Sequence, residues 1–267
     1  YEFTLADDEF LVTYDVVNLY PSIPHALCLE MVNSFLERSW DEVNVFERIG
    51  SVTLIMALLK LVLSLNYCQY AGVVFLQMLG YATGTACGAE VAHLYLCEIF
   101  KTLFRSVRRN LRLHKRYVDD GFLVWRGPET CLRRFLSDLD SQHAAVRITF
   151  AVSRRLCIFL DLHLSVSASG AVESSVYQKE QNRFLYPLWN SEIPRSTLAG
   201  IAIGECIRYI KRCSRRADYI EMLKLFSQRL AARGWPGWFI TKAFKRAPDY
   251  DERMRLLRMG PWANRTN

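Results

Sequence analysis

The stretch Phe10–Pro24, FLVTYDVVNLYPSIP, decides the fold prediction. Its first part, residues 10–17, is apolar and β-branched, which is typical of a buried strand, and Pro21 and Pro24 end that pattern. Asp15 stands close to the end of this strand, although strands are depleted in aspartate. Because local propensity does not explain a carboxylate here, Asp15 is a candidate for chemistry.

A second stretch, residues 115–125, KRYVDDGFLVW, places Asp119 and Asp120 between two apolar strands. Asp-Asp-Gly is typical of a tight hairpin turn, and such a turn standing alone is usually only structural. Phosphoryl transfer with two metal ions, however, needs carboxylates that converge from different strands. Magnesium prefers oxygen ligands and leaves part of its coordination shell to substrate phosphates. Asp15 together with Asp119 and Asp120 therefore predicts a site for two Mg²⁺ ions, and Mn²⁺ fits the same ligands.

Composition excludes several classes of protein. The chain has 267 residues, 51% hydrophobic and 23% charged, which is enough to form a packed core. Its eight cysteines show no CxxC spacing and its five histidines no HExxH motif, so a disulfide scaffold and a zinc hydrolase are excluded. The most apolar run, residues 52–65, is too short for a membrane span, and the N-terminus lacks the pattern of a signal peptide. We expect a nuclear or cytoplasmic protein that is neither secreted nor membrane-bound.

Positive charge gathers in the last quarter of the chain. The net charge is +7, and residues 201–267 hold 15 of the 34 Lys+Arg but only 6 of the 27 Asp+Glu. A basic segment of this kind is the electrostatic footprint of a phosphate-backbone binder, although a solubilising surface has the same composition. Arg208, Lys211, Arg212 and Arg215 follow helical spacing and share one face. We predict that these four side chains contact nucleic acid.

The hydrophobic pattern predicts an α+β fold with an all-helical tail. Expected strands cover residues 10–17, 67–76 (a pair), 113–117, 122–125, 147–152, 157–166 and 172–177. Expected helices cover residues 26–38, 52–65, 90–108, 129–140, 197–212, 218–231 and 238–244.

On these residues the chain resembles reverse transcriptases. YDVVNLYPSIP resembles polymerase motif A and YVDD resembles motif C, and Asp15 and Asp119 are 104 positions apart. The segment QMLGYATGTACGAEVAHLYL looks like motif B in the form found in Penelope-like retroelements, which are related to telomerase. FLDLHL, residues 159–164, resembles the strand after motif D, and the basic tail resembles the thumb of the same group.

The resemblance implies a right-hand polymerase palm, an antiparallel sheet with packed helices, followed by an all-helical thumb. Residues 1–190 would form the palm with part of the fingers, and residues 191–267 the basic thumb. The expected motif boundaries are 10–24 for motif A, 77–96 for motif B, 115–125 for motif C and 129–166 for the motif D/E region.

The resemblance also implies roles for single residues. Asp15 and Asp119 would be the main metal ligands, with Asp120 as third carboxylate and Val16 beside the metal and the nucleotide. Tyr20 would be a steric gate against a 2′-hydroxyl, and the alternative is a core tyrosine beside Pro21. Gln77 and Gly84 would contact the nucleotide, and Phe159 and Leu160 would contact the primer.

The implied activity is that of an RNA-directed DNA polymerase with an RNA template, a DNA primer and dNTPs as partners. Gly88-Ala89 departs from the Ser-Pro or Ala-Pro that usually opens the motif B helix, and no Lys or Arg precedes Asp15. In this family the fingers that hold the triphosphate precede motif A, so we expect fingers, and in some relatives a GIY-YIG endonuclease, outside this chain. The alternatives are an inactive or domesticated polymerase fold that binds RNA or RNA–DNA duplex, and an RNA-dependent RNA polymerase, which Tyr20 and YVDD disfavour.

Overall fold

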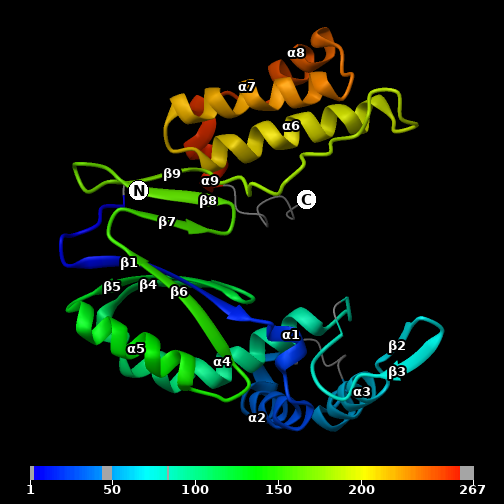
Figure 1. Ribbon diagram of the computed structural model, residues 1–267, viewed down its shortest axis with the longest axis vertical. Helices are drawn as coiled ribbons and strands as arrows, with labels where there is room; N and C mark the ends of the chain where they lie inside the picture. Colours follow the sequence, from blue (N-terminus) through cyan, green and yellow to red (C-terminus); the bar gives the residue numbers. More distant parts are fainter. Residues whose placement is uncertain (1–2, 44–49, 83, 259–267) are drawn as a thin grey trace. The chain divides into compact units, whose positions relative to one another are not determined.

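The computed structural model describes residues 3–43, 50–82 and 84–258, which form two units (Figure 1). Asp7–Arg154 make up the first, here named the carboxylate unit; Tyr1–Ala6 with Arg155–Asn267 make up the second, here named the helical unit. Thr83 of the expected motif B and the last nine residues of the expected thumb lie outside the described residues.

The carboxylate unit is built on a four-stranded antiparallel sheet of order β4-β5-β1-β6. Its strands are β1 (Glu9–Val17), β4 (Leu111–Tyr117), β5 (Asp120–Arg126) and β6 (Arg147–Ser153). A separate hairpin is formed by β2 (Tyr67–Tyr70) and β3 (Val73–Leu76).

The helices of this unit are α1 (Leu19–Ser22), α2 (His25–Val43), α3 (Val52–Ser64), α4 (Gly88–Ser106), the 3₁₀ turn η1 (Arg108–Asn110) and α5 (Glu129–Ser141). Helices α4 and α5 pack on one face of the sheet, and the other helices extend this layer, α2 packing on α4 and α3 on α2. Alternate residues of β1 and β5, such as Val12 and Leu123, enter one core with Leu96 of α4 and Phe135 of α5. Figure 1 shows α4 and α5 lying along the same side of this sheet.

The helical unit combines a three-stranded sheet with a helical bundle. The strands are β7 (Leu156–Phe159), β8 (Leu162–Val166) and β9 (Val172–Val176), in the order β7-β8-β9. The helices are α6 (Arg195–Arg212), α7 (Arg216–Ala232), α8 (Gly237–Arg246), the 3₁₀ turn η2 (Tyr250–Glu252) and α9 (Arg253–Arg258). A core of its own joins the helices around Tyr209, Phe226 and Trp235.

The division into units falls at Arg154/Arg155, whereas the expected palm and thumb meet at residue 190. The reason lies in β9, which is tied to the helices rather than to the four-stranded sheet. Ser174 donates its hydroxyl to Arg212 O at 2.7 Å, and its N–H donates to Ser214 Oγ at 2.9 Å. Val176 packs against the helical core.

Most expected elements are confirmed, and the α+β fold class with them. The single strand expected over residues 157–166 is wrong: the chain reverses at Leu160 and Asp161, where Leu160 takes φ +56°, and forms the β7–β8 hairpin. The short helices α1 and α9 were not expected. Among the described helices, none has both the length and the apolar character needed to cross a bilayer.

Candidate active site

Strand pairing brings the two carboxylate segments together. Strand β1 runs antiparallel to β5, with Tyr14 opposite Gly121, and one residue beyond Asp15 the Val16 N–H donates to Asp119 O at 3.3 Å. Residues 104 positions apart in the sequence thus lie on adjoining strands. The central prediction, that motifs A and C meet, agrees with this geometry.

Side-chain alternation separates the carboxylates from the core. Tyr14 and Val16 are buried in the core under the helices, so Asp15 between them belongs to the opposite face of the sheet, where it is exposed. Asp120 precedes Gly121, whose α-carbon faces the Tyr14 ring, and therefore belongs to the same face as Asp15. This face holds Asp15 and Asp120, with Asp119 in the adjoining turn.

The turn of the β4–β5 hairpin differs from the expected one. Its two loop residues are Val118 and Asp119, whereas Asp120 already pairs with Tyr117 in the ladder. Val118 takes φ +54°, a left-handed conformation that is costly for a β-branched residue. Arg116 holds the turn, because its guanidinium donates to Val118 O at 2.6 Å and to His93 O of α4 at 3.1 Å.

Gly121 makes room for the ring of Tyr14. A Cβ on Gly121 would lie 2.0–2.5 Å from three carbon atoms of that ring. The Tyr14 hydroxyl is hydrogen-bonded to His114 Nε2 at 2.9 Å, and the His114 ring stacks on Phe104 at 4.1 Å. Burial, with the positive charges of Arg116 and Lys115, lowers the pKa of His114 to about 4, so the imidazole is neutral at pH 7. Glycine in the YVDDG segment is therefore required by packing.

We expect Gly121→Ala to destabilise the carboxylate unit by about 1–3 kcal/mol, because the Tyr14 ring has to move out of a packed core. Native-state hydrogen exchange measures the loss in each unit, at the β1 amides for this variant and at the α6 amides for its control. The matched control is Gly204→Ala in α6, where nothing lies within 4 Å of the added methyl group and alanine is the better helix former. Equal loss of stability in the two variants would contradict the packing role of Gly121.

A buried ion cluster joins strands at the other end of the sheet, and no sequence pattern indicates it. Glu9 is completely buried at the start of β1. Its carboxylate accepts from Arg112 of β4 at 2.6 Å and from Arg126 of β5 at 2.7 Å. The three residues join three neighbouring strands through one carboxylate. No local pattern predicts this cluster, because both arginines lie more than 100 positions after Glu9 in the sequence.

The segment expected as motif B docks on the turn after motif A. The Tyr81 N–H donates to Tyr20 O at 2.7 Å, and the Gly80 N–H donates to Ile23 O at 3.0 Å. Gly80 has φ +83°, and a Cβ there would lie 2.5 Å from the carbonyl oxygen of Pro21. The ring of Tyr20, which is half-buried, would be 3.7 Å from a Cβ on Gly88 at the start of α4. Motifs A and B are therefore joined by backbone contacts around Tyr20.

Two further expected nucleotide contacts lie in the same segment. Gln77 closes the β2–β3 hairpin: its N–H donates to Asn66 O at 2.8 Å and its side chain to Leu79 O at 2.9 Å. Gly84 is exposed with φ +95° and has nothing within 4 Å of an added Cβ. These contacts give Gln77 a local structural role, and its role with a nucleotide stays a prediction.

The expected primer and duplex contacts all lie in the helical unit. Phe159 and Leu160 form the tip of the β7–β8 hairpin, next to Asp161. Asp161 pairs with Arg208 at 3.2 Å and with Arg212 at 2.5 Å.

The remaining two cations of the expected stripe differ from each other. Arg215 pairs with Asp218 at 2.7 Å and with Glu173 at 3.6 Å, whereas Lys211 makes no ion pair with any described residue. Three of the four expected phosphate contacts are thus already paired with carboxylates. Their role at nucleic acid stays a prediction.

The carboxylates fit divalent metal ions by their chemistry. Within the described ranges, no group of three or more His, Cys, Asp or Glu side chains is gathered tightly enough to hold a metal by itself. Magnesium sites at phosphates commonly use only one or two protein carboxylates, and the substrate supplies further oxygens. Asp15 and Asp119 on adjoining segments meet that requirement.

Comparison with known proteins identifies the fold. No protein-family model and no curated protein sequence matches this chain. Among solved structures, telomerase from Candida albicans, in complex with a fragment of telomeric RNA, matches 96% of the chain at 12% identity and a TM-score of 0.58. The RNA-dependent RNA polymerase of a human picobirnavirus matches 92% at 13% identity and a TM-score of 0.56. The polymerase of BmCPV at its elongation state matches 84% at 12% identity and a TM-score of 0.56.

The chain covers less than half of each of these structures: 46% of the telomerase, 47% of the picobirnavirus polymerase and 21% of the BmCPV polymerase. At this level of identity the likeness concerns the fold alone. The chain thus has the mixed α+β fold of telomerase and viral RNA polymerases.

Proposed function

We propose that this chain is the catalytic part of an RNA-directed DNA polymerase of the Penelope-like type. The observation that carries the proposal is the pairing of β1 with β5, which sets Asp15 beside Asp119 on a polymerase fold. The YVDD sequence and Tyr20 favour DNA synthesis over RNA synthesis. The test is Mg²⁺-dependent extension of a DNA primer on an RNA template, with Asp119→Asn as the control.

The proposed mechanism assigns each carboxylate a place. Asp15, from the end of β1, and Asp119, from the adjoining turn, would hold two Mg²⁺ ions, with Asp120 as a third carboxylate nearby. When bound, such ions lower the pKa of the primer 3′-hydroxyl and stabilise the charge on the triphosphate. The chain's own contribution is position: Arg116 anchors the turn of Asp119 to α4, and Gly121 lets β5 approach Tyr14.

We expect Tyr20→Ala to raise the ratio of rNTP to dNTP incorporation roughly ten- to a hundredfold, because the phenol ring would otherwise clash with the 2′-hydroxyl. Single-nucleotide incorporation with dNTP and rNTP in parallel measures the ratio. Tyr20→Phe is the matched control, since it keeps the ring and should keep the ratio. An unchanged ratio in Tyr20→Ala would assign Tyr20 to packing against the core near Gly88.

An exposed apolar surface supports the prediction of further fingers residues. All eight residues of β2 and β3 are exposed, among them Tyr70, which is 78% exposed. Leu54, Leu58 and Leu61 of the neighbouring α3 are each about half exposed. A concentration of exposed apolar side chains of this kind is typical of an interaction site. We propose that fingers residues outside this chain cover it.

A binding protein without catalysis is the second candidate. The observation that favours it is the departure at Gly88-Ala89 from the Ser-Pro or Ala-Pro that usually opens the motif B helix in the family it resembles. Such a protein would bind RNA or RNA–DNA duplex, and Asp119→Asn would change neither binding nor any activity. Loss of primer extension in that variant separates the two candidates.

A further inference from the structure

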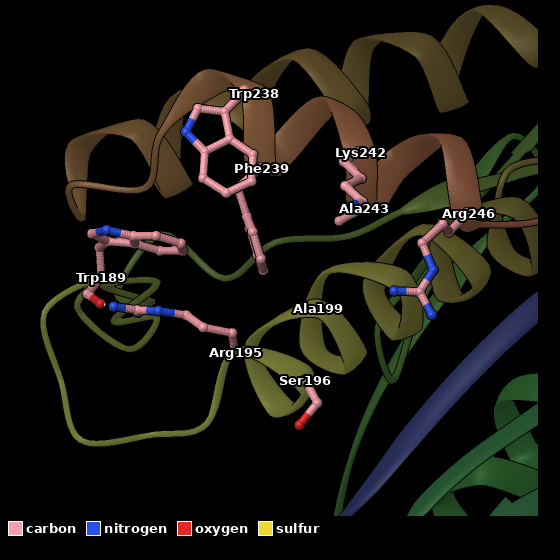
Figure 2. A pocket seen from close by; sticks show the side chains of 9 residues that line it. All are labelled: Trp189, Arg195, Ser196, Ala199, Trp238, Phe239, Lys242, Ala243 and Arg246. Atoms are coloured by element: carbon pink, nitrogen blue, oxygen red, sulfur yellow. The ribbon is translucent and has the colours of Figure 1, made fainter.

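The helical unit contains a pocket that the polymerase assignment does not use. Its volume is about 350 Å³, which lies in the range of small-ligand sites. It is bounded by the N-terminal turn of α6, by α8 and by the loop before α6, as Figure 2 shows. Its lining residues are Trp189, Arg195, Ser196, Ala199, Trp238, Phe239, Lys242, Ala243 and Arg246.

The lining is both aromatic and basic. It holds three aromatic rings and three cations and no carboxylate. Lys242 and Arg246 make no ion pair with any residue in the described part of the chain, unlike Arg208 and Arg212. A concentration of positive charge without a protein counter-ion fits an anionic ligand.

The aromatic rings are arranged so that one of them stays available. The Arg195 guanidinium stacks on the Trp189 ring at 3.7 Å and donates to the Trp189 carbonyl oxygen. Figure 2 shows Arg195 extended along Trp189 and the indole of Trp238 on the α8 side. Trp238 meets Trp189 edge-on at 6.2 Å and Phe239 at 5.7 Å, yet 65% of its surface is exposed. An indole held in place by its edge contacts but open to solvent is a platform for stacking.

Helical spacing sets the charges beside this platform. Trp238, Lys242 and Arg246 follow each other at intervals of four residues on α8, so they form one stripe. Each interval corresponds to about 6 Å along the helix axis. The indole and the two cations therefore lie along one face of α8, where a single ligand can contact all three.

We propose that this pocket binds an unpaired nucleotide of single-stranded nucleic acid, the base stacking on Trp238 and the phosphates meeting Lys242 and Arg246. Stacking on aromatic side chains combined with a basic groove is how proteins bind single strands without reading sequence. A base within a duplex cannot bind in this pocket, because it is stacked between its neighbours and cannot enter a concave site. The inference goes beyond the polymerase assignment, since every residue involved belongs to the helical unit and none takes part in catalysis.

The first test uses fluorescence anisotropy with the full chain and a fluorescein-labelled uridine decamer. Trp238→Ala should weaken binding about tenfold or more. Lys242→Gln with Arg246→Gln should reduce the slope of log affinity against log salt by about 1.4, the value for two phosphate contacts on a single strand. The matched control, Lys224→Gln with Lys245→Gln, removes two exposed cations outside the pocket and should leave the affinity within about twofold.

A second readout locates the ligand. A decamer that carries 5-bromouridine should crosslink to Trp238 under ultraviolet light, as mapped by mass spectrometry, and Asp119→Asn should leave the crosslink unchanged. Competition by adenosine monophosphate would assign a free nucleotide as the source, whereas competition by deoxyuridine or uridine decamers alone would assign a strand. The proposal is overturned if Trp238→Ala binds like the wild type, if the control variant loses as much affinity as the pocket variant, or if a glutamate peptide displaces the decamer while no crosslink to Trp238 forms.

Discussion

Asp119→Asn is expected to lower primer extension by about three orders of magnitude or more while leaving folding and duplex binding intact. The amide keeps the shape of the side chain but removes its charge. Metal ions at a transferring phosphoryl group contribute several kcal/mol, and 1.4 kcal/mol corresponds to a tenfold change in rate. Because Asp119 sits in a two-residue turn, the substitution disturbs no core packing.

The measurement is steady-state incorporation of a single dNTP on an RNA template–DNA primer, beside a binding titration with the same duplex. Asp120→Asn is the informative companion, since Asp120 belongs to the ladder of β5 and would act as the third carboxylate. We expect it to lose less activity than Asp119→Asn. Retained extension in Asp119→Asn would contradict the assignment of Asp119 to the metal site.

The second large effect is on stability. Replacing Arg112 and Arg126 together by methionine is expected to destabilise the carboxylate unit by about 3–5 kcal/mol, because the completely buried Glu9 carboxylate then loses both of the arginines that pair with it. Native-state hydrogen exchange of the β1 amides measures this loss within the unit, independently of the helical unit. Adding Glu9→Met to the double variant is expected to restore most of the stability, since it removes the buried carboxylate charge.

The matched control for this cluster is Arg133→Met, which removes an arginine from an exposed pair with Glu129 on α5. Exposed pairs of that kind contribute roughly 0.3–0.5 kcal/mol. If the double variant were no less stable than this control, or if Glu9→Met restored nothing, the buried cluster would not be what fastens the three strands.

Sequence patterns predicted the local elements well. Strand β1 was expected over residues 10–17 and covers Glu9–Val17, and α5 was expected over residues 129–140 and covers Glu129–Ser141. Both are long, regular patterns in which one face is apolar throughout, so burial and local propensity favour the same structure. The adjacency of Asp15 and Asp119 was predicted as well, because both motifs stand at the ends of apolar strands.

The features that were not predicted depend on tertiary contacts. The β7–β8 reversal requires Leu160 to adopt a positive φ, which a leucine in an apolar run does not signal. The ion pairs of Asp161 with Arg208 and Arg212 join the β7–β8 hairpin to α6. Asp161 and Arg208 are 47 positions apart in the sequence. The helical spacing of Arg208 and Arg212 was correct, but it could not show that a carboxylate faces them.

RNA-directed DNA synthesis by this chain is measured by offering the wild-type protein an annealed RNA template and DNA primer with Mg²⁺ and either dNTPs or rNTPs. We expect extension with dNTPs that is lost when Mg²⁺ is chelated, and little or no extension with rNTPs. Extension with rNTPs in preference to dNTPs, or tight binding of the duplex with no incorporation of either, would contradict this expectation.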